Sequence, residues 1–133
     1  MSAMPNYLLI DDDDIIQFVH KNILAKAHPD AHVTAVFSGA EALAFLVDCG
    51  DEEWPQMVFL DINMPMQSGF EFLDGLKEAH PDLHAKLVTQ SRLFLLTSSV
   101  NPRDVAEAEA HGEIERLLSK PLTVQTVEDL EKG

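Results

Sequence analysis

Polar side chains suited to phosphate and metal chemistry follow four apolar runs of this sequence. The first is an unbroken acidic segment, Asp11–Asp14, and the others are Asp61, Thr97 and Lys120. In open parallel sheets, ligands bind beyond the carboxyl ends of the strands. If the runs are neighbouring parallel strands, we expect these side chains to meet at one end of the sheet.

Converging carboxylates repel one another unless a cation lies among them or some of them bind protons. A hard divalent ion such as Mg²⁺ needs only one or two carboxylates, with water and phosphate oxygens as its other ligands. With Mg²⁺ bound, the carboxylate of Asp61 could attack phosphorus as a nucleophile. Mg²⁺, the Lys120 ammonium and the Thr97 hydroxyl would balance the charge of the transferring phosphoryl group. The predicted chemistry is phosphoryl transfer to an aspartate.

Five short apolar segments are predicted to be strands. Three are almost continuously apolar, which is typical of strands buried on both faces of a parallel sheet. A fourth is more mixed, as an edge strand would be, and a fifth is very short. In that order they are Tyr7–Ile10, Met57–Leu60 and Leu93–Leu96, then His32–Phe37, then Leu117–Leu118.

Five helical patterns alternate with these segments. Two carry start signals: a possible capping box from Ser38 to Glu41, and the N-cap and first-turn proline of Asn101-Pro102. The stretches 48–56, 80–90 and 111–116 are expected to be irregular connections. The alternation predicts an α/β fold, a doubly wound five-stranded parallel sheet with helices on both faces. We expect a single domain over residues 1–133, with its core at about 6–132.

Composition limits the classes of function. The 133 residues are 46% hydrophobic, enough for one packed domain, and 9 Lys+Arg against 23 Asp+Glu give a net charge of −14. Such acidity disfavours direct nucleic-acid binding. A lone cysteine, Cys49, suits a reducing compartment, and no apolar run reaches the ~18–20 residues of a membrane span. We therefore expect a cytoplasmic protein without membrane insertion.

Four motifs, taken together and in order, resemble the receiver domain of two-component response regulators, in particular its single-domain, chemotaxis-regulator-like form. The resemblance covers residues 6–132, and it implies a flavodoxin-like fold with strand order 2-1-3-4-5. The motifs are Leu8-Leu9-Ile10-Asp11-Asp12-Asp13, Leu60-Asp61-Ile62-Asn63-Met64-Pro65 with Gly69, Leu96-Thr97-Ser98, and Lys120-Pro121.

The resemblance also implies a role for each site residue. Asp61 matches the phosphoacceptor, Asp12 the direct Mg²⁺ ligand, and Asp11 its partner, which usually acts through water. Asn63 matches the position whose backbone carbonyl completes the metal site. The implied metal site is therefore Asp11, Asp12, Asp61 and Asn63.

Thr97 and Lys120 match the hydroxyl and the cation that contact the phosphoryl group, and the Lys120-Pro121 bond is expected to be cis. One position departs from the commonest family pattern. Leu117 stands where an aromatic side chain usually rotates on activation. Thr97 therefore has no aromatic partner at this position with which its movement could be coupled in the usual way.

The implied function is a signalling switch in a two-component phosphorelay. A sensor histidine kinase or a histidine phosphotransfer protein would donate the phosphoryl group, and an unknown protein target would read the phosphorylated state. We expect that the protein is not an enzyme. The only reactions expected of it are self-phosphorylation from small donors and slow autodephosphorylation. Because the chain ends about one helix after Lys120, we expect it to dock on a partner or to pass the phosphoryl group onward.

Three other interpretations remain. A Mg²⁺-dependent phosphohydrolase could use Asp61 as its nucleophile, but haloacid-dehalogenase-type phosphatases carry an acid where Asn63 stands. The chain could be a receiver that binds partners without phosphorylation, or a receiver excised from a larger hybrid kinase or regulator. The six histidines are expected at the surface and not at a metal site, because the closest pair, His80 and His84, straddles Pro81.

Overall fold

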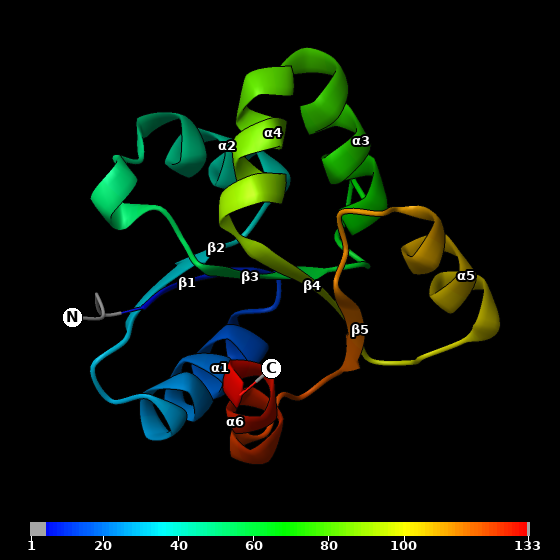
Figure 1. The fold of residues 1–133 in the computed structure, drawn as a ribbon. Helices are drawn as coiled ribbons and strands as arrows, with labels where there is room; N and C mark the ends of the chain where they lie inside the picture. Colours follow the sequence, from blue (N-terminus) through cyan, green and yellow to red (C-terminus); the bar gives the residue numbers. More distant parts are fainter. Residues whose placement is uncertain (1–4, 133) are drawn as a thin grey trace.

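The computed structural model describes residues 5–132, and within them it contains a five-stranded parallel sheet (Figure 1). The strand order is β2-β1-β3-β4-β5, which confirms the expected doubly wound arrangement. The ends of the predicted domain, residues 1–4 and 133, lie outside the described residues. The strands are β1 (Asn6–Ile10), β2 (His32–Val36), β3 (Met57–Asp61), β4 (Arg92–Thr97) and β5 (Arg116–Ser119).

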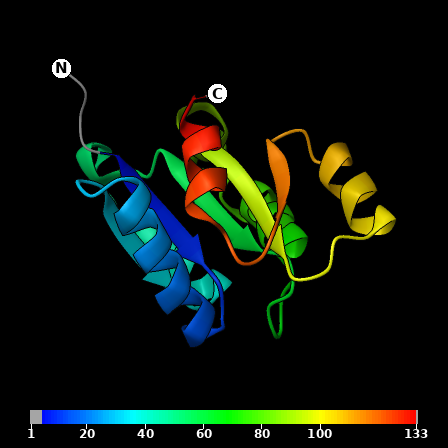
Figure 2. The ribbon, with the colours of Figure 1, turned by 90° about the horizontal axis from the view of Figure 1, so that it is seen from below.

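Helices cover both faces of the sheet. Figures 1 and 2 show α1 and α6 together on one face, α2, α3 and α4 on the other, and α5 beside the β5 edge. Across the described part of the chain, no helix has both the length and the apolar character to cross a membrane. The helices are α1 (Asp14–Ala27), α2 (Gly39–Asp48), α3 (Gly69–Ala79), α4 (Pro81–Gln90), α5 (Pro102–Ala110) and α6 (Val124–Lys132), with a short 3₁₀ turn, η1 (Asp51–Glu53).

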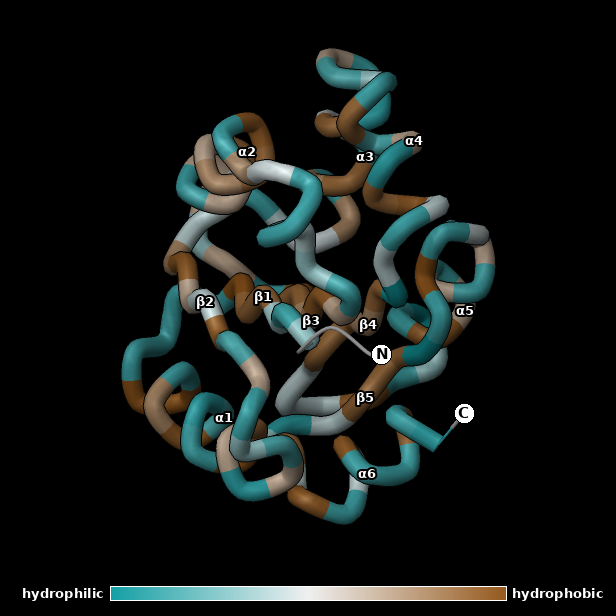
Figure 3. Tube along the Cα trace, turned by 60° about the vertical axis from the view of Figure 1, so that its left-hand side comes forward, coloured by the Kyte–Doolittle hydropathy of each residue, from teal (hydrophilic) through white to brown (hydrophobic). Residues whose placement is uncertain are grey.

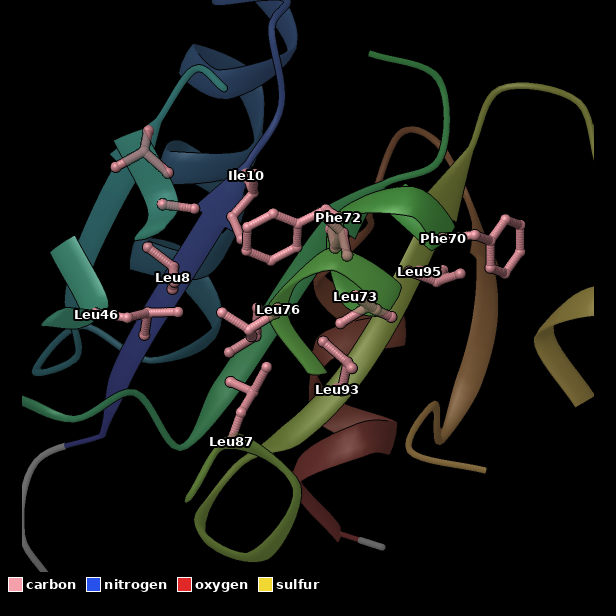
Figure 4. Close-up of a cluster of buried hydrophobic side chains, with 14 of the residues drawn as sticks. Leu8, Ile10, Leu46, Phe70, Phe72, Leu73, Leu76, Leu87, Leu93 and Leu95 are labelled. Atoms are coloured by element: carbon pink, nitrogen blue, oxygen red, sulfur yellow. The ribbon is translucent and has the colours of Figure 1, made fainter. Parts of the chain in front are cut away.

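The apolar runs form the central strands because both of their faces are buried. Successive side chains of a strand point to opposite faces. Leu8 and Ile10 therefore contribute to a first core, under α2, α3 and α4, whereas Tyr7 and Leu9 contribute to a second core, under α1 and α6. The hydrophobic stretches of the chain accordingly gather along the sheet in Figure 3. Figure 4 shows the first core, in which leucines and phenylalanines of α3 lie over β3 and β4.

Two helices lie where a single helix and an irregular connection were expected. The prediction of five helices was wrong because residues 80–90 contain α4. Pro81 ends α3 but also begins α4, since a first-turn helical residue needs no N–H donor. His80 is therefore both the C-cap of α3 and the N-cap of α4. Leu83 and Leu87, spaced at i and i+4, face the first core.

Polar caps fix where the helices begin. Ser38 Oγ accepts the Glu41 N–H at 3.1 Å, as predicted, but the Glu41 carboxylate accepts from Phe37 and not from Ser38. A complete capping box occurs instead at Ser68 and Glu71, where α3 begins. The predicted Asn101 cap of α5 is confirmed.

Phe94 should be a major source of stability. It is fully buried and stacked on Phe59, with ring centroids 5.4 Å apart. We expect Phe94→Ala to lower the free energy of unfolding by about 3–5 kcal/mol in urea titrations, because it leaves a cavity between the sheet and α6. The matched control is Phe18→Ala at an exposed site on α1, which should change stability by less than about 0.5 kcal/mol. Equal losses in the two variants would contradict the assignment of this core.

Candidate functional site

Three carboxylates lie together beyond the carboxyl ends of β1 and β3. One oxygen each from Asp11, Asp12 and Asp61 lies within 4.8 Å of the others. Asp12 is exposed, but Asp11 and Asp61 keep only 1% and 2% of their surface accessible. β1 and β3 are parallel neighbours, so their ends bring residues 50 positions apart into one pocket.

Lys120 bridges the two buried carboxylates. Its Nζ lies 2.8 Å from Asp11 Oδ2 and 2.9 Å from Asp61 Oδ1. The residue directly follows β5, and its backbone N–H donates to the Thr97 carbonyl at 2.8 Å. The peptide bond to Pro121 is cis, as the resemblance implied.

Burial sets the protonation behaviour of this pair. Burial raises the pKa of Asp61 to about 6, and the Asp11 charge adds to the rise, against the opposing effects of Lys120 and the Asn63 N–H. For Lys120, burial lowers the pKa, but the bonds to Asp11 and Asp61 outweigh it and the net shift is upward. The site therefore holds a firmly charged ammonium beside a carboxylate that takes up a proton more readily than usual.

The turn after β3 brings the backbone of α3 against Asp61. The Gly69 N–H donates to the Ile62 carbonyl at 2.8 Å, and a Cβ on Gly69 would lie only 2.7 Å from the Asp61 carbonyl oxygen. Only glycine permits this approach. The Asn63 N–H donates to Asp61 Oδ1 at 3.1 Å and orients the carboxylate from the exposed side.

Thr97 is fully buried at the end of β4, and its hydroxyl bonds locally. Oγ1 donates to the Ser99 carbonyl at 3.1 Å and accepts the Ser99 N–H at 3.2 Å. The structure thus brings Asp11, Asp12, Asp61 and Lys120 into contact range, while the Thr97 hydroxyl is engaged with its own loop. Leu117, in place of the usual aromatic, packs half-buried against the first core.

Sequence reasoning missed two buried polar residues of α1, Gln17 and His20. Gln17 Nε2 donates to the carbonyls of Leu9, Asp11 and Val36, and so ties the ends of β1 and β2 together. The expectation of surface histidines was wrong for His20, which is fully buried. Their spacing could have indicated their burial, because positions 17 and 20 fall on the same helical face as the buried Leu24.

The donor set fits a hard divalent cation. Carboxylate oxygens are the preferred ligands of such ions, and among the described residues the Lys120 ammonium is the only partner of the buried Asp11 Oδ2. Three carboxylates against one ammonium also leave a negative balance at the pocket.

Comparisons with known proteins agree with this geometry. Residues 7–130 match the family model of the response regulator receiver domain. Response regulator Rcp1 of Synechocystis is 32% identical over 108 residues, which are 78% of this chain and 69% of that protein. The transcriptional regulator NtrC of Rhizobium meliloti is 28% identical over 122 residues; the match covers 86% of this chain but only 24% of NtrC. A solved two-component response regulator from Cytophaga hutchinsonii superposes with a TM-score of 0.83 at 35% identity, covering 98% of this chain and 96% of that one.

The chain belongs to the response regulator receiver domain family of two-component signalling, whose members are phosphoacceptor switches. These matches do not favour the phosphohydrolase interpretation.

The raised pKa of Asp61 predicts that the free energy of unfolding depends on pH. The folded protein holds the Asp61 proton more tightly than the unfolded chain does, so its stability falls as pH rises from about 4 to about 6. In EDTA, we expect Asp61→Asn to gain about 2–3 kcal/mol relative to wild type across this range and to keep that gain at pH 7.5. Urea titrations at a series of pH values measure the difference.

The control for this experiment is Asp30→Asn, which removes an exposed carboxylate from the turn before β2. It should show no such gain. A stability difference between Asp61→Asn and wild type that is constant from pH 4 to 7.5 would contradict the prediction.

Proposed function

We propose that this chain is a phosphoryl-accepting switch in which Asp61 is the acceptor. A carboxylate oxygen of Asp61 attacks the phosphorus of a phosphohistidine on a histidine kinase or phosphotransfer protein. The P–N bond breaks, the imidazole leaves with the electron pair and takes up a proton, and Asp61 becomes an acyl phosphate. The observation that carries the proposal is the Lys120 ammonium 2.9 Å from a buried carboxylate, where it can stabilise charge that develops on the phosphoryl oxygens.

Asp11, Asp12, Asp61 and the Asn63 backbone carbonyl would hold Mg²⁺. When bound, Mg²⁺ would neutralise phosphoryl oxygens and allow two anionic groups to approach each other. Asp12 is the exposed carboxylate of the set and would bind the ion directly, with Asp11 acting through water. Asp11 also accepts the Asp13 N–H at 3.0 Å, which keeps its carboxylate directed at the pocket.

The new phosphoryl group would change the partners of Lys120 and Thr97. Lys120 would pair with a phosphoryl oxygen, and the Thr97 hydroxyl would exchange the Ser99 carbonyl for the phosphoryl group. That exchange releases the segment between β4 and α5 and biases a pre-existing equilibrium. Since Leu117 replaces the usual aromatic, we propose that the β4–α5 segment carries the response to an unidentified protein target.

We propose one receiver domain over residues 6–132 in a cytoplasmic protein. It would phosphorylate itself from small donors and dephosphorylate slowly, without turning over a separate substrate. The net charge of −14 supports a protein partner over direct binding to nucleic acid.

Phosphorylation of Asp61 tests the proposed function. Incubation with phosphoramidate and Mg²⁺ should add one phosphoryl mass to the intact protein. Peptide mapping should place it on Asp61, because this residue matches the phosphoacceptor position of the family and lies 2.9 Å from Lys120 Nζ. Asp61→Asn should not label, whereas the exposed Asp14→Asn on α1 should label at the wild-type rate. Unlabelled wild type, or equal labelling of Asp61→Asn, would refute the proposal.

Removal of one carboxylate should weaken the metal site. We expect Asp12→Asn to raise the Mg²⁺ dissociation constant by roughly tenfold or more in calorimetric titrations, because it removes a direct charged ligand. Asp14→Asn removes an equal charge two residues away, outside the carboxylate group, and should shift the constant by less than about twofold through screened electrostatics. Equal shifts in the two variants would indicate a diffuse charge effect and contradict the assigned ligand.

A further inference from the structure

The position of Lys120 depends on a short backbone segment between β5 and α6. On its upstream side, the Lys120 N–H donates to the Thr97 carbonyl at the end of β4. On its downstream side, Pro121 has no N–H to donate. The first backbone donor after Lys120 is therefore Leu122, and whatever accepts its N–H holds the second end of the segment.

His20 is that acceptor. Its Nε2 lies 3.0 Å from the Leu122 nitrogen, a bond that joins α1 to the segment before α6 across 102 positions of sequence. Both residues are buried, His20 completely and Leu122 to 2% exposure. A bond in such surroundings is shielded from water and holds its partners firmly.

The bond also defines the form of the imidazole. A ring nitrogen that accepts an N–H carries a lone pair, so the proton of His20 lies on Nδ1. Burial lowers the pKa of His20, against the Asp11 charge, which raises it, while Lys120 lowers it further. The ring is thus neutral and remains an acceptor.

His20 makes this bond at a cost to stability. Its Nδ1 is buried with no hydrogen-bond partner among the described residues. An unsatisfied buried donor is destabilising, because it gives up its hydrogen bonds to water without replacing them. A purely apolar side chain would avoid that cost, but it would leave the Leu122 N–H without an acceptor.

We propose that His20 is a positioning residue of the phosphoryl-accepting site. By holding the Leu122 N–H, it fixes the Lys120-Pro121 segment so that the Lys120 ammonium lies between Asp11 and Asp61. The inference rests on the proposed function of Asp61 as acceptor. His20 would act on the rate through the position of Lys120, because a displacement of about 1 Å at a catalytic group can lower the rate as much as 100-fold.

Two variants at the same position test the role of the acceptor. His20→Leu removes it, whereas His20→Gln keeps a side-chain oxygen that can accept the Leu122 N–H. The measurement is the rate of Asp61 labelling by phosphoramidate with Mg²⁺, a small donor that needs no protein docking. We expect His20→Leu to label about tenfold more slowly than wild type and His20→Gln to remain within about threefold. His20→Met, a second apolar variant of flexible shape, should behave as His20→Leu does.

A second background separates positioning from general loss of stability. If His20 acts through Lys120, then adding His20→Leu to Lys120→Ala should not slow labelling further, because the group being positioned is already gone. A merely structural role would slow both backgrounds by the same factor. Thermal unfolding of each variant ensures that rates are compared below the transition.

The outcomes distinguish the inference from the function on which it rests. Wild-type rates in the folded apolar variants, an equal loss in His20→Gln and His20→Leu, or an equal effect in the Lys120→Ala background would each overturn the role of His20 alone. Failure of wild type to label on Asp61 would refute the proposed function, and the role of His20 with it.

Discussion

Two buried carboxylates share a single ammonium, and the rest of the structure is arranged to make that possible. Asp11 and Asp61 are almost entirely removed from water, where like charges repel strongly. Lys120 offsets part of that repulsion. It reaches both carboxylates from the end of β5, which β4 separates from β3 in the sheet. The parallel sheet meets this requirement because all of its strands end on the same side. The negative charge that Lys120 does not cancel is the basis for the proposed cation site.

Rigid elements position each member of the site. The strand ends lie between two packed cores. The backbone at Asp61 and Thr97 is therefore held firmly in place. Polar side chains of α1 extend this support: Gln17 binds three carbonyls at the ends of β1 and β2, and His20 reaches the segment after Lys120. α1 therefore supports the backbone around the site, although its own side chains lie outside the acidic pocket.

The sequence was sufficient to predict the parts of the molecule that depend on local patterns. Continuous apolar runs predicted the central strands, and the polar residues that follow them indicated which side chains the fold brings together. α4 was missed because Pro81 carries the same local signal whether it ends a helix or begins one. His20 was missed because its partner, the Leu122 N–H, lies 102 positions away. Nearly every residue has a backbone N–H, so residue types do not show which of them needs a side-chain acceptor. The bond between Thr97 and Ser99 depends on a loop conformation that residue types alone do not specify.

The place of Lys120 along the chain has a consequence for biosynthesis. Domains are made from the N-terminus onward, so a ribosome releases both carboxylates long before it releases their cation. Within residues 5–132, β5 is the last strand along the chain, and it pairs only with β4. A chain synthesised only as far as β4 contains both carboxylates but not the ammonium that bridges them in the folded domain. The charge balance of the pocket is therefore completed only after β5 has been synthesised, because the ammonium that pairs with both carboxylates directly follows that strand.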